Sequence, residues 1–134
     1  MYFNKLEQCV KSQKINYSET REIIYRILVD TKECLNVGEI IEKLSNGYPK
    51  KISINTVYRT LKLFIECKIV MSINDNVNKA YYILDEDETL VFSICPDCNS
   101  IKKINLSTTF FIDPLVEELK GSKIITIHKK CLMC

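Results

Sequence analysis

The stretch SINTVYRTLKLFIECKIVMSINDNVNKAYYIL occupies residues 53–84 and decides the fold of the N-terminal half of the chain. Its first part starts with a favourable N-cap, Ser53, and continues with apolar residues at helical spacing. Its second part holds two runs of strand-forming residues, 69–74 and 79–84, joined by the turn-rich sequence DNVN. The apolar stripe of the helix consists of Val57, Leu61 and Phe64. A helix that leads directly into a β-hairpin predicts the second half of a winged helix-turn-helix domain.

Two more helices are predicted upstream of this stretch. Ser18 is a suitable cap for a helix that runs to about Val29, with acidic side chains in its first turn. Asn36 and Glu39 have the spacing of a capping box, which opens the next helix. The residues expected to be buried are Ile23, Ile24, Ile27 and Leu28 in the first of these helices, and Val37, Ile40, Ile41 and Leu44 in the second.

A second, smaller unit of mixed α and β structure is predicted further along the chain. The acidic sequence DEDE, residues 85–88, suits a solvated linker, and we place the hinge at residues 85–89. Strands are expected over residues 90–94, 101–106 and 123–128, with a short helix that Asp113-Pro114 opens and Gly121 ends. The chain is therefore predicted to be α+β, with a winged-helix domain over residues 1–84 and a small α/β domain over residues 90–134.

The charge of the chain is unevenly distributed. Residues 1–84 carry 13 Lys and Arg against 9 Asp and Glu, whereas residues 85–134 carry 6 against 8. A basic N-terminal half suits a polyanionic partner, although many solvated helical faces carry as much charge. No run approaches the roughly 18 apolar residues of a membrane span, and the start of the chain lacks the pattern of a secretory signal. We therefore expect a cytoplasmic protein with no membrane partner.

Seven cysteines is a high number for a chain expected in a reducing compartment, where metal binding or redox chemistry is commoner than stable disulfides. Four of them form two C-x-x-C pairs, Cys95 with Cys98 and Cys131 with Cys134, each after a predicted strand. Each pair can place two thiolates on one zinc ion, and two pairs close a tetrahedral site with no open position for catalysis. The lysines close enough in sequence to offset its negative charge are Lys102, Lys103, Lys129 and Lys130. The pattern predicts one structural zinc ion per chain.

The same residues allow alternative interpretations. The spacer of 32 residues between the pairs is longer than in common zinc ribbons, so the pairing could be coincidental. A C-x-x-C pair can also carry disulfide exchange, but a thioredoxin-like pair opens a helix in a βαβ unit that is not predicted here. The single histidine, His128, is expected to be a solvated residue at a strand end rather than a support of the zinc loop. An enzyme is thus disfavoured, and a zinc-ribbon protein that binds a protein partner is the main rival to a DNA-binding protein.

Two motifs in this order resemble the ferric uptake regulator (Fur) family. The sequence ISINTVYRTL at residues 52–61 is close to the recognition-helix motif of the family, and CPDC and CLMC match its structural zinc site. The resemblance extends from about residue 15 to residue 134. It implies a homodimer, formed through the C-terminal domain, that binds double-stranded DNA at a palindromic operator and regulates transcription, usually as a repressor.

The predicted DNA contacts lie on and around the recognition helix, whose first residues meet base edges in the major groove. Base contacts are expected from Ile54, Asn55, Tyr58 and Arg59, and phosphate contacts from Lys50, Lys51 and Lys62. The alternative is an exposed amphipathic helix with ordinary surface charge. The family often has an arginine where this chain has Asn16, so that contact is lost or moved to the nearby Lys14. Lys68 replaces the glycine that usually follows this helix, at a position that often needs a positive φ.

The resemblance also implies a second metal site between the domains, which commonly switches family members on. Its histidine and acidic ligand positions fall on Cys34, Leu90, Val91, Phe92, Lys103 and Lys123, with a looser match near Tyr82. A chain with one histidine cannot build a histidine-rich site, and the ammonium group of Lys103 would repel a cation. We therefore predict that the iron- or manganese-sensing site is absent and that Lys103 and apolar packing hold the domains in place of metal. The alternative is that Cys34, alone or with Cys9 or Cys67, senses oxidant or binds a soft metal, although buried inert thiols are commoner.

Overall fold

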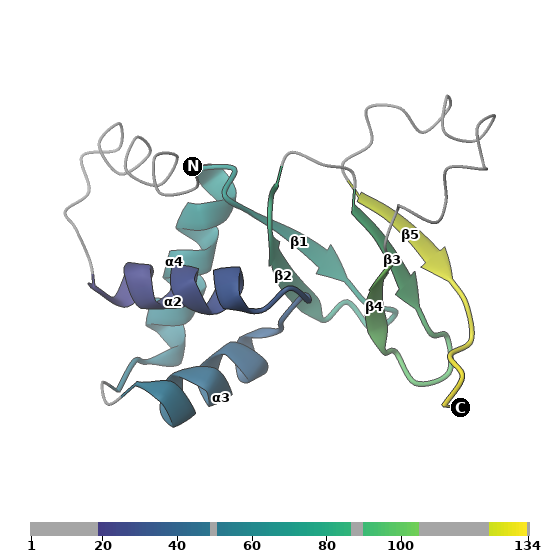
Figure 1. Cartoon of the computed structure of the whole chain (residues 1–134), viewed down its shortest axis with the longest axis horizontal. Helices are drawn as coiled ribbons and strands as arrows, with labels where there is room; N and C mark the ends of the chain where they lie inside the picture. Colours follow the sequence, from purple (N-terminus) through teal and green to yellow (C-terminus); the bar gives the residue numbers. More distant parts are fainter. Residues whose placement is uncertain (1–18, 49–50, 87–89, 105–123, 134) are drawn as a thin grey trace. The chain divides into compact units, whose positions relative to one another are not determined.

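The structure is a computed structural model that describes residues 19–48, 51–86, 90–104 and 124–133 (Figure 1). The chain divides into two compact units. The first comprises Met1–Ser72 and Ala80–Glu86, and the second comprises Ile73–Lys79 and Asp87–Cys134. The turn of the predicted hairpin is thus grouped with the C-terminal unit.

Three helices of the first unit form where capping signals and apolar stripes coincide. They are α2 (Glu19–Asp30), α3 (Val37–Gly47) and α4 (Ile54–Glu66). The side chain of Asn36 accepts from the N–H of Glu39 at 2.8 Å, and the Glu39 carboxylate accepts from the N–H of Asn36 at 3.1 Å, so the capping box is confirmed. Ser53 caps α4, since its Oγ accepts from the N–H of Thr56 at 3.3 Å. Ser18, the predicted cap of α2, lies outside the described residues.

The three helices bury one continuous apolar core. Its fully buried members include Ile24 of α2, Ile40 of α3, and Val57 and Phe64 of α4. The ring of Tyr25 lies edge-on to that of Phe64, with 6.3 Å between the ring centroids. The predicted stripes therefore face inward, with Ile41 only partly buried. Truncating a buried side chain of this size to alanine costs about 2–5 kcal/mol, so the core firmly fixes which face of α4 is exposed.

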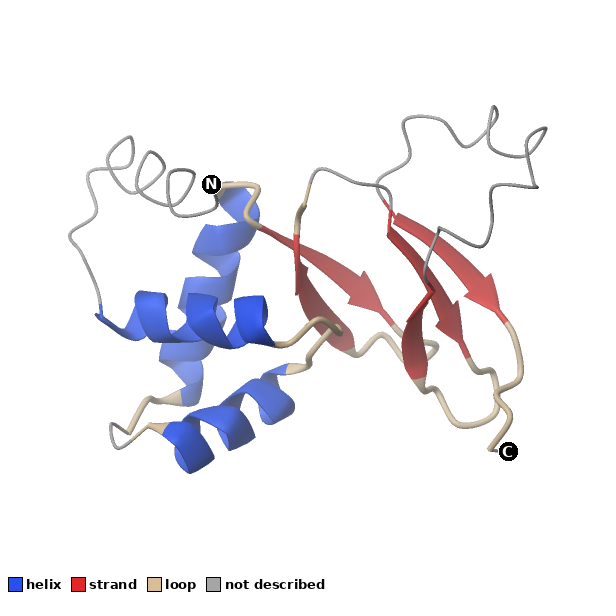
Figure 2. Cartoon of the chain, in the orientation of Figure 1, coloured by secondary structure: helices blue, strands red, loops and turns tan. Residues whose placement is uncertain are grey.

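A β-hairpin follows α4 and completes the winged helix (Figure 2). It consists of β1 (Val70–Asn74) and β2 (Ala80–Leu84). Leu35 forms a bridge to β2, donating its N–H to the Tyr82 carbonyl at 2.9 Å and accepting from the Tyr82 N–H at 2.7 Å. This bridge ties the connection between α2 and α3 to the hairpin. Lys68, which joins α4 to β1, has a φ of 59°, so a non-glycine residue occupies the left-handed region there.

The acidic segment after β2 begins inside the fold and not in solvent. Asp85 is 7% exposed, and its N–H donates to the carbonyl of Ile69 at 2.8 Å. The prediction that residues 85–88 form a solvated linker is therefore wrong for Asp85. The acidic pattern does not predict this burial, because the backbone N–H of an aspartate can pair with a distant carbonyl group whatever the charge of its side chain.

The second unit contains a three-stranded sheet in the order β4-β3-β5 (Figure 2). Its strands are β3 (Leu90–Ile94), β4 (Ile101–Ile104) and β5 (Ile124–His128). Strand β3 pairs antiparallel with β4 and parallel with β5, and the latter register places Ile94 opposite His128. Because β3 and β5 run parallel, the segments that follow them leave the sheet at the same edge. The helix predicted at residues 113–121 lies outside the described residues.

The predicted α+β class is confirmed, with a winged helix followed by a small unit built on a sheet. Within the described ranges, no helix has the length and apolar character needed to cross a membrane.

Candidate metal centre and DNA-facing helix

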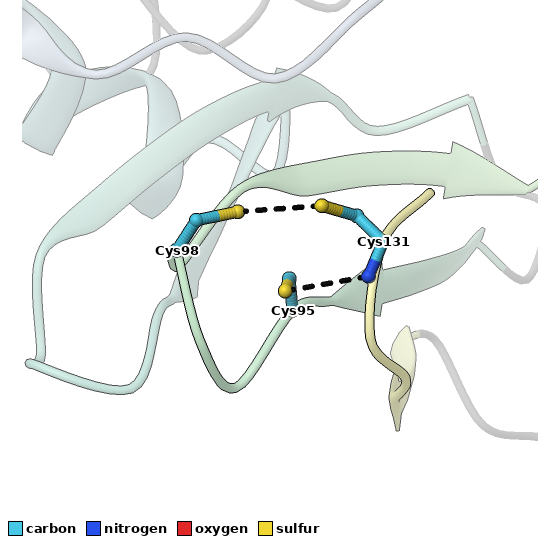
Figure 3. Close-up of side chains that lie close together, drawn as sticks. All are labelled: Cys95, Cys98 and Cys131. Atoms are coloured by element: carbon cyan, nitrogen blue, oxygen red, sulfur yellow. Dashed lines mark hydrogen bonds between the residues drawn. The ribbon is translucent and has the colours of Figure 1, made fainter. Parts of the chain in front are cut away.

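Three cysteine sulfurs converge where β3 and β5 end (Figure 3). The Sγ atoms of Cys95, Cys98 and Cys131 lie within 4.8 Å of one another, and those of Cys98 and Cys131 are 3.5 Å apart. Tetrahedral zinc with Zn–S bonds of about 2.3 Å holds its sulfurs roughly 3.8 Å apart. The described sulfurs are therefore close to the spacing of a zinc site. Cys134, the predicted fourth ligand, lies outside the described residues.

Backbone hydrogen bonds bring the two cysteine segments together. The N–H of Lys129 donates to the carbonyl of Ile94 at 3.0 Å, which extends the β3–β5 ladder up to the sulfurs. Within the first segment, the N–H of Cys95 donates to the carbonyl of Ser100, and the N–H of Asn99 donates to the carbonyl of Cys95, both at 3.0 Å. Asn99 has a φ of 61°, which asparagine tolerates better than most residues. These bonds fold residues 95–100 into a tight knuckle, which we call the first knuckle.

The sulfur of Cys95 is stabilised as a thiolate. The N–H of Cys131 points at Cys95 Sγ from 3.3 Å (Figure 3). This hydrogen bond and others from Cys98 and Asp97 lower the pKa of the Cys95 thiol to about 6, although burial opposes the shift. Because the thiolate is the form that binds metal, Cys95 is prepared for ligation at neutral pH.

The cluster fits a metal site better than a redox-active disulfide pair, because a redox pair needs two sulfurs and here three lie together. Within the described part of the chain, these cysteines are the one group of His, Cys, Asp and Glu side chains arranged to hold a metal ion. None of these three cysteines forms a disulfide. His128 is exposed at the end of β5, as predicted. Of the nearby lysines, Lys130 forms an exposed ion pair with Asp97 at 3.6 Å, which contributes little stability.

Helix α4 presents a second group of predicted site residues to solvent. Ile54 and Tyr58 are 51% and 50% exposed, so two large side chains in the first half of α4 lie outside the core. Asn55, Arg59 and Lys62 are also exposed, and their spacing places all five on one face of the helix. The remaining predicted contacts are Lys51, which is exposed, and Lys50 and Lys14, which lie outside the described residues.

Three of the positions that the resemblance assigns to a sensory metal site hold apolar side chains. Leu90, Val91 and Phe92 are buried along β3, and Lys103 lies opposite Phe92 in the register of β3 and β4. Tyr82 is buried in β2. Lys123 lies outside the described residues.

The cysteines outside the cluster differ from one another. Cys34 is buried, and this burial, with a contribution from the charge of Glu33, raises the pKa of its thiol to about 11. Cys34 is thus protonated at neutral pH, which is the less reactive form. Cys67, the C-cap of α4, is disulfide-bonded. Cys9 lies outside the described residues.

Two features of this part of the structure are not predicted by the sequence pattern. Asn76, treated only as a turn residue, donates from Nδ2 to the carbonyl of Cys95 at 3.1 Å. No local pattern signals this contact, because 19 positions separate the two residues. The second feature is the disulfide of Cys67. The only indication of it in the sequence is that three of the seven cysteines fall outside the two C-x-x-C pairs.

Comparisons with known proteins agree with this architecture. The sequence matches the ferric uptake regulator family over residues 12–130. A ferric uptake regulation protein of Bacillus subtilis is 25% identical over 138 residues, which cover 98% of this chain and 93% of that protein. One of Staphylococcus epidermidis is 29% identical over 105 residues, covering 78% of this chain and 75% of that protein.

Solved structures share the fold. The ferric uptake regulator Fur of Helicobacter pylori has a TM-score of 0.78 at 19% identity, covering 99% of this chain and 91% of its own. A zinc-bound manganese uptake regulator has a TM-score of 0.68 at 22% identity, covering 96% of this chain and 99% of its own. Since the family match spans most of the sequence, the chain belongs to the ferric uptake regulator family, whose members are transcription regulators and not enzymes.

Proposed function

We propose that this protein is a sequence-specific DNA-binding repressor that acts as a homodimer with one structural zinc ion per chain. The observation that carries the proposal is the exposed face of α4, where Ile54, Tyr58 and Arg59 stand out from a winged helix. A helix of this kind enters the major groove with its N-terminal half.

The exposed side chains of α4 divide by chemistry into two kinds of contact. Arg59 and Asn55 can form paired hydrogen bonds with base edges, while Tyr58 and Ile54 offer apolar contact to a thymine methyl group or a sugar. The lysines on and around α4 are proposed to bind phosphates, and such contacts set the salt dependence of affinity. The lysines in question are Lys51, Lys62, Lys50 and Lys14.

The DNA interface is tested by Arg59→Ala, with Arg26→Ala as the matched control. Arg26 is exposed on α2 and pairs with Glu22 at 2.7 Å, so its removal takes away the same charge from a different surface. If Arg59 reads a base, its loss should weaken operator binding by roughly 1–3 kcal/mol, while Arg26→Ala stays close to wild type. Electrophoretic shift titrations on the protein's own promoter give both affinities. Equal losses in the two variants would move the interface away from α4.

The zinc ion is proposed to be held by Cys95, Cys98, Cys131 and Cys134. Support comes from the convergence of the three described sulfurs and from the lowered pKa of the Cys95 thiol. When bound, zinc cross-links the ends of β3 and β5 and leaves no open position for catalysis. The free energy of metal binding then adds to the stability of a unit with a small core.

We further propose that this regulator lacks the iron- or manganese-sensing site of its relatives. The single histidine of the chain and the buried apolar residues Leu90, Val91 and Phe92 support this absence. We expect Lys103 and the apolar packing around it to hold the domains in the DNA-binding arrangement instead. Operator affinity measured with and without added Mn²⁺ or Fe²⁺, with the zinc left in place, should then be the same within about twofold. Strong activation by either ion would defeat this part of the proposal.

A thiol switch is a second candidate, and the disulfide of Cys67 favours it. Cys67 is the C-cap of α4, so reduction of its disulfide by a dithiol, with two electrons and two protons, would change the constraint on the recognition helix. The raised pKa of Cys34 makes that residue the weaker choice. Under this alternative, dithiothreitol changes operator affinity of the wild type and of Cys34→Ser but not of Cys67→Ser.

A further inference from the structure

The turn of the β1–β2 hairpin reaches the first knuckle of the metal centre. Asn76 Nδ2 donates to the carbonyl oxygen of Cys95 at 3.1 Å, and both residues belong to the same compact unit. The same oxygen accepts the N–H of Asn99 at 3.0 Å. Cys95 is therefore held both by its own knuckle and by a side chain from a distant turn.

The turn that carries Asn76 is fixed by its neighbour, Asp75. The Oδ1 atom of Asp75 accepts from the N–H groups of Val77 and Lys79, both at 2.9 Å. Its backbone N–H donates to the Lys79 carbonyl at 3.0 Å, and its carbonyl accepts the N–H of Asn78 at 3.1 Å. Asp75 is only 7% exposed, and these hydrogen bonds supply the partners that a buried carboxylate needs. The turn is thus ordered by its own bonds, and the side-chain amide of Asn76 is held at the knuckle.

We propose that Asn76 is a positioning residue of the metal centre and that the hairpin turn and the bound metal stabilise each other. The bond from Asn76 limits the movement of the Cys95 backbone and so limits where its sulfur points. A metal ion on Cys95, Cys98 and Cys131 in turn holds the carbonyl that Asn76 needs. Metal binding and ordering of the turn both depend on this hydrogen bond, so each raises the equilibrium constant of the other by the same factor. The inference rests on the proposed zinc site, and it connects that site to the hairpin of the winged helix.

The first test measures how fast zinc leaves the full-length, zinc-loaded protein in a chromophoric chelator under reducing conditions. Asn76→Ala removes the donor, and Asn76→Asp keeps the shape but replaces the donor with acceptors. Both should release zinc roughly two- to tenfold faster than wild type, which is the effect of one hydrogen bond. The matched control is Val77→Ala, since Val77 is in the same turn and 68% exposed, and it should match wild type.

The second test follows amide hydrogen exchange at Val77 and Lys79, whose N–H groups report on the turn. In the wild type, zinc should slow their exchange, because the bound metal holds the Cys95 carbonyl to which Asn76 donates. In Asn76→Ala, this zinc dependence should vanish at the turn but persist in β3. The inference would be overturned if both Asn76 variants released zinc at the wild-type rate. It would also be overturned if amide exchange at Val77 and Lys79 of the wild type were the same with and without zinc. A wild type that binds no zinc would instead overturn the metal site, and this inference with it.

Discussion

Cysteine takes opposite protonation states in two environments of this chain. The Cys95 sulfur accepts backbone hydrogen bonds that lower its pKa to about 6, whereas the pKa of the Cys34 thiol is raised to about 11. Burial is common to both residues, so the decisive difference is the set of N–H groups that point at Cys95. The largest contribution comes from the N–H of Cys131, in the other cysteine segment, and the turn of the first C-x-x-C pair adds the N–H groups of Cys98 and Asp97.

The Cys34 thiol should stabilise the protein in a pH-dependent way. Its pKa rises from 9.0 to about 11 on folding, so its contribution is fully present below pH 9.0 and is lost as the pH rises through about 11. Urea unfolding of wild type and Cys34→Ala across this range should give a difference in free energy of unfolding that falls as the pH rises. A difference that stays constant would show that the folded thiol titrates normally.

Alkylation of Cys34 in the native protein should also be at least about tenfold slower than in urea.

At the level of single elements, the capping box of α3 is the sharpest local signal in the chain. Asn36→Ala removes the acceptor for the Glu39 N–H and leaves that donor without its side-chain partner. We expect the free energy of unfolding to fall by about 1 kcal/mol, within a range of roughly 0.5–2 kcal/mol. Glu42→Ala, an exposed change in the same helix, should stay within about 0.5 kcal/mol of wild type. Similar losses in both variants would mean that helix propensity, and not the cap, sets the stability of α3.

Elements whose ends depend on local bonds could be predicted from the sequence. The starts of α3 and α4 follow Asn36 and Ser53 because a cap acts on a backbone group three residues away. Strand ends depend on partners elsewhere, and the predicted strand at residues 69–74 accordingly begins one residue later, at Val70. Asp85 escaped prediction for the same reason, since its partner, Ile69, is distant in sequence.

The candidate site was predictable only as a set of residues. The two C-x-x-C pairs predict its ligands, but the parallel pairing of β3 with β5, which brings Cys95 and Cys131 together, has no local signature. The contribution of Asn76 depends on that same long-range geometry. The exposed face of α4 was predictable, because the helical period assigns each position to the core or to solvent.

For the whole molecule, the division into two compact units predicts that metal loss damages them unequally. Cys98→Ser should lose zinc and the dimer together, because the C-terminal sheet loses its cross-link. The helices α2 to α4 have their own core and should keep their far-ultraviolet circular dichroism signal. Metal analysis and analytical ultracentrifugation measure the first two quantities, with Cys34→Ser as the control that keeps both. Unchanged zinc content in Cys98→Ser would remove Cys98 from the site.

The pairing of β3 with both of its neighbours also sets the order in which the second unit folds. Strands β3 and β4 are joined by the short segment 95–100, so they can pair quickly, and the first knuckle forms between them. Strand β5 starts only at Ile124, and closing that longer loop costs more chain entropy and more time. A zinc ion captured early would therefore sit on two thiolates and exchange rapidly with its surroundings. Its exchange should slow only when β5 docks, so the kinetic inertness of the metal reports that folding is complete.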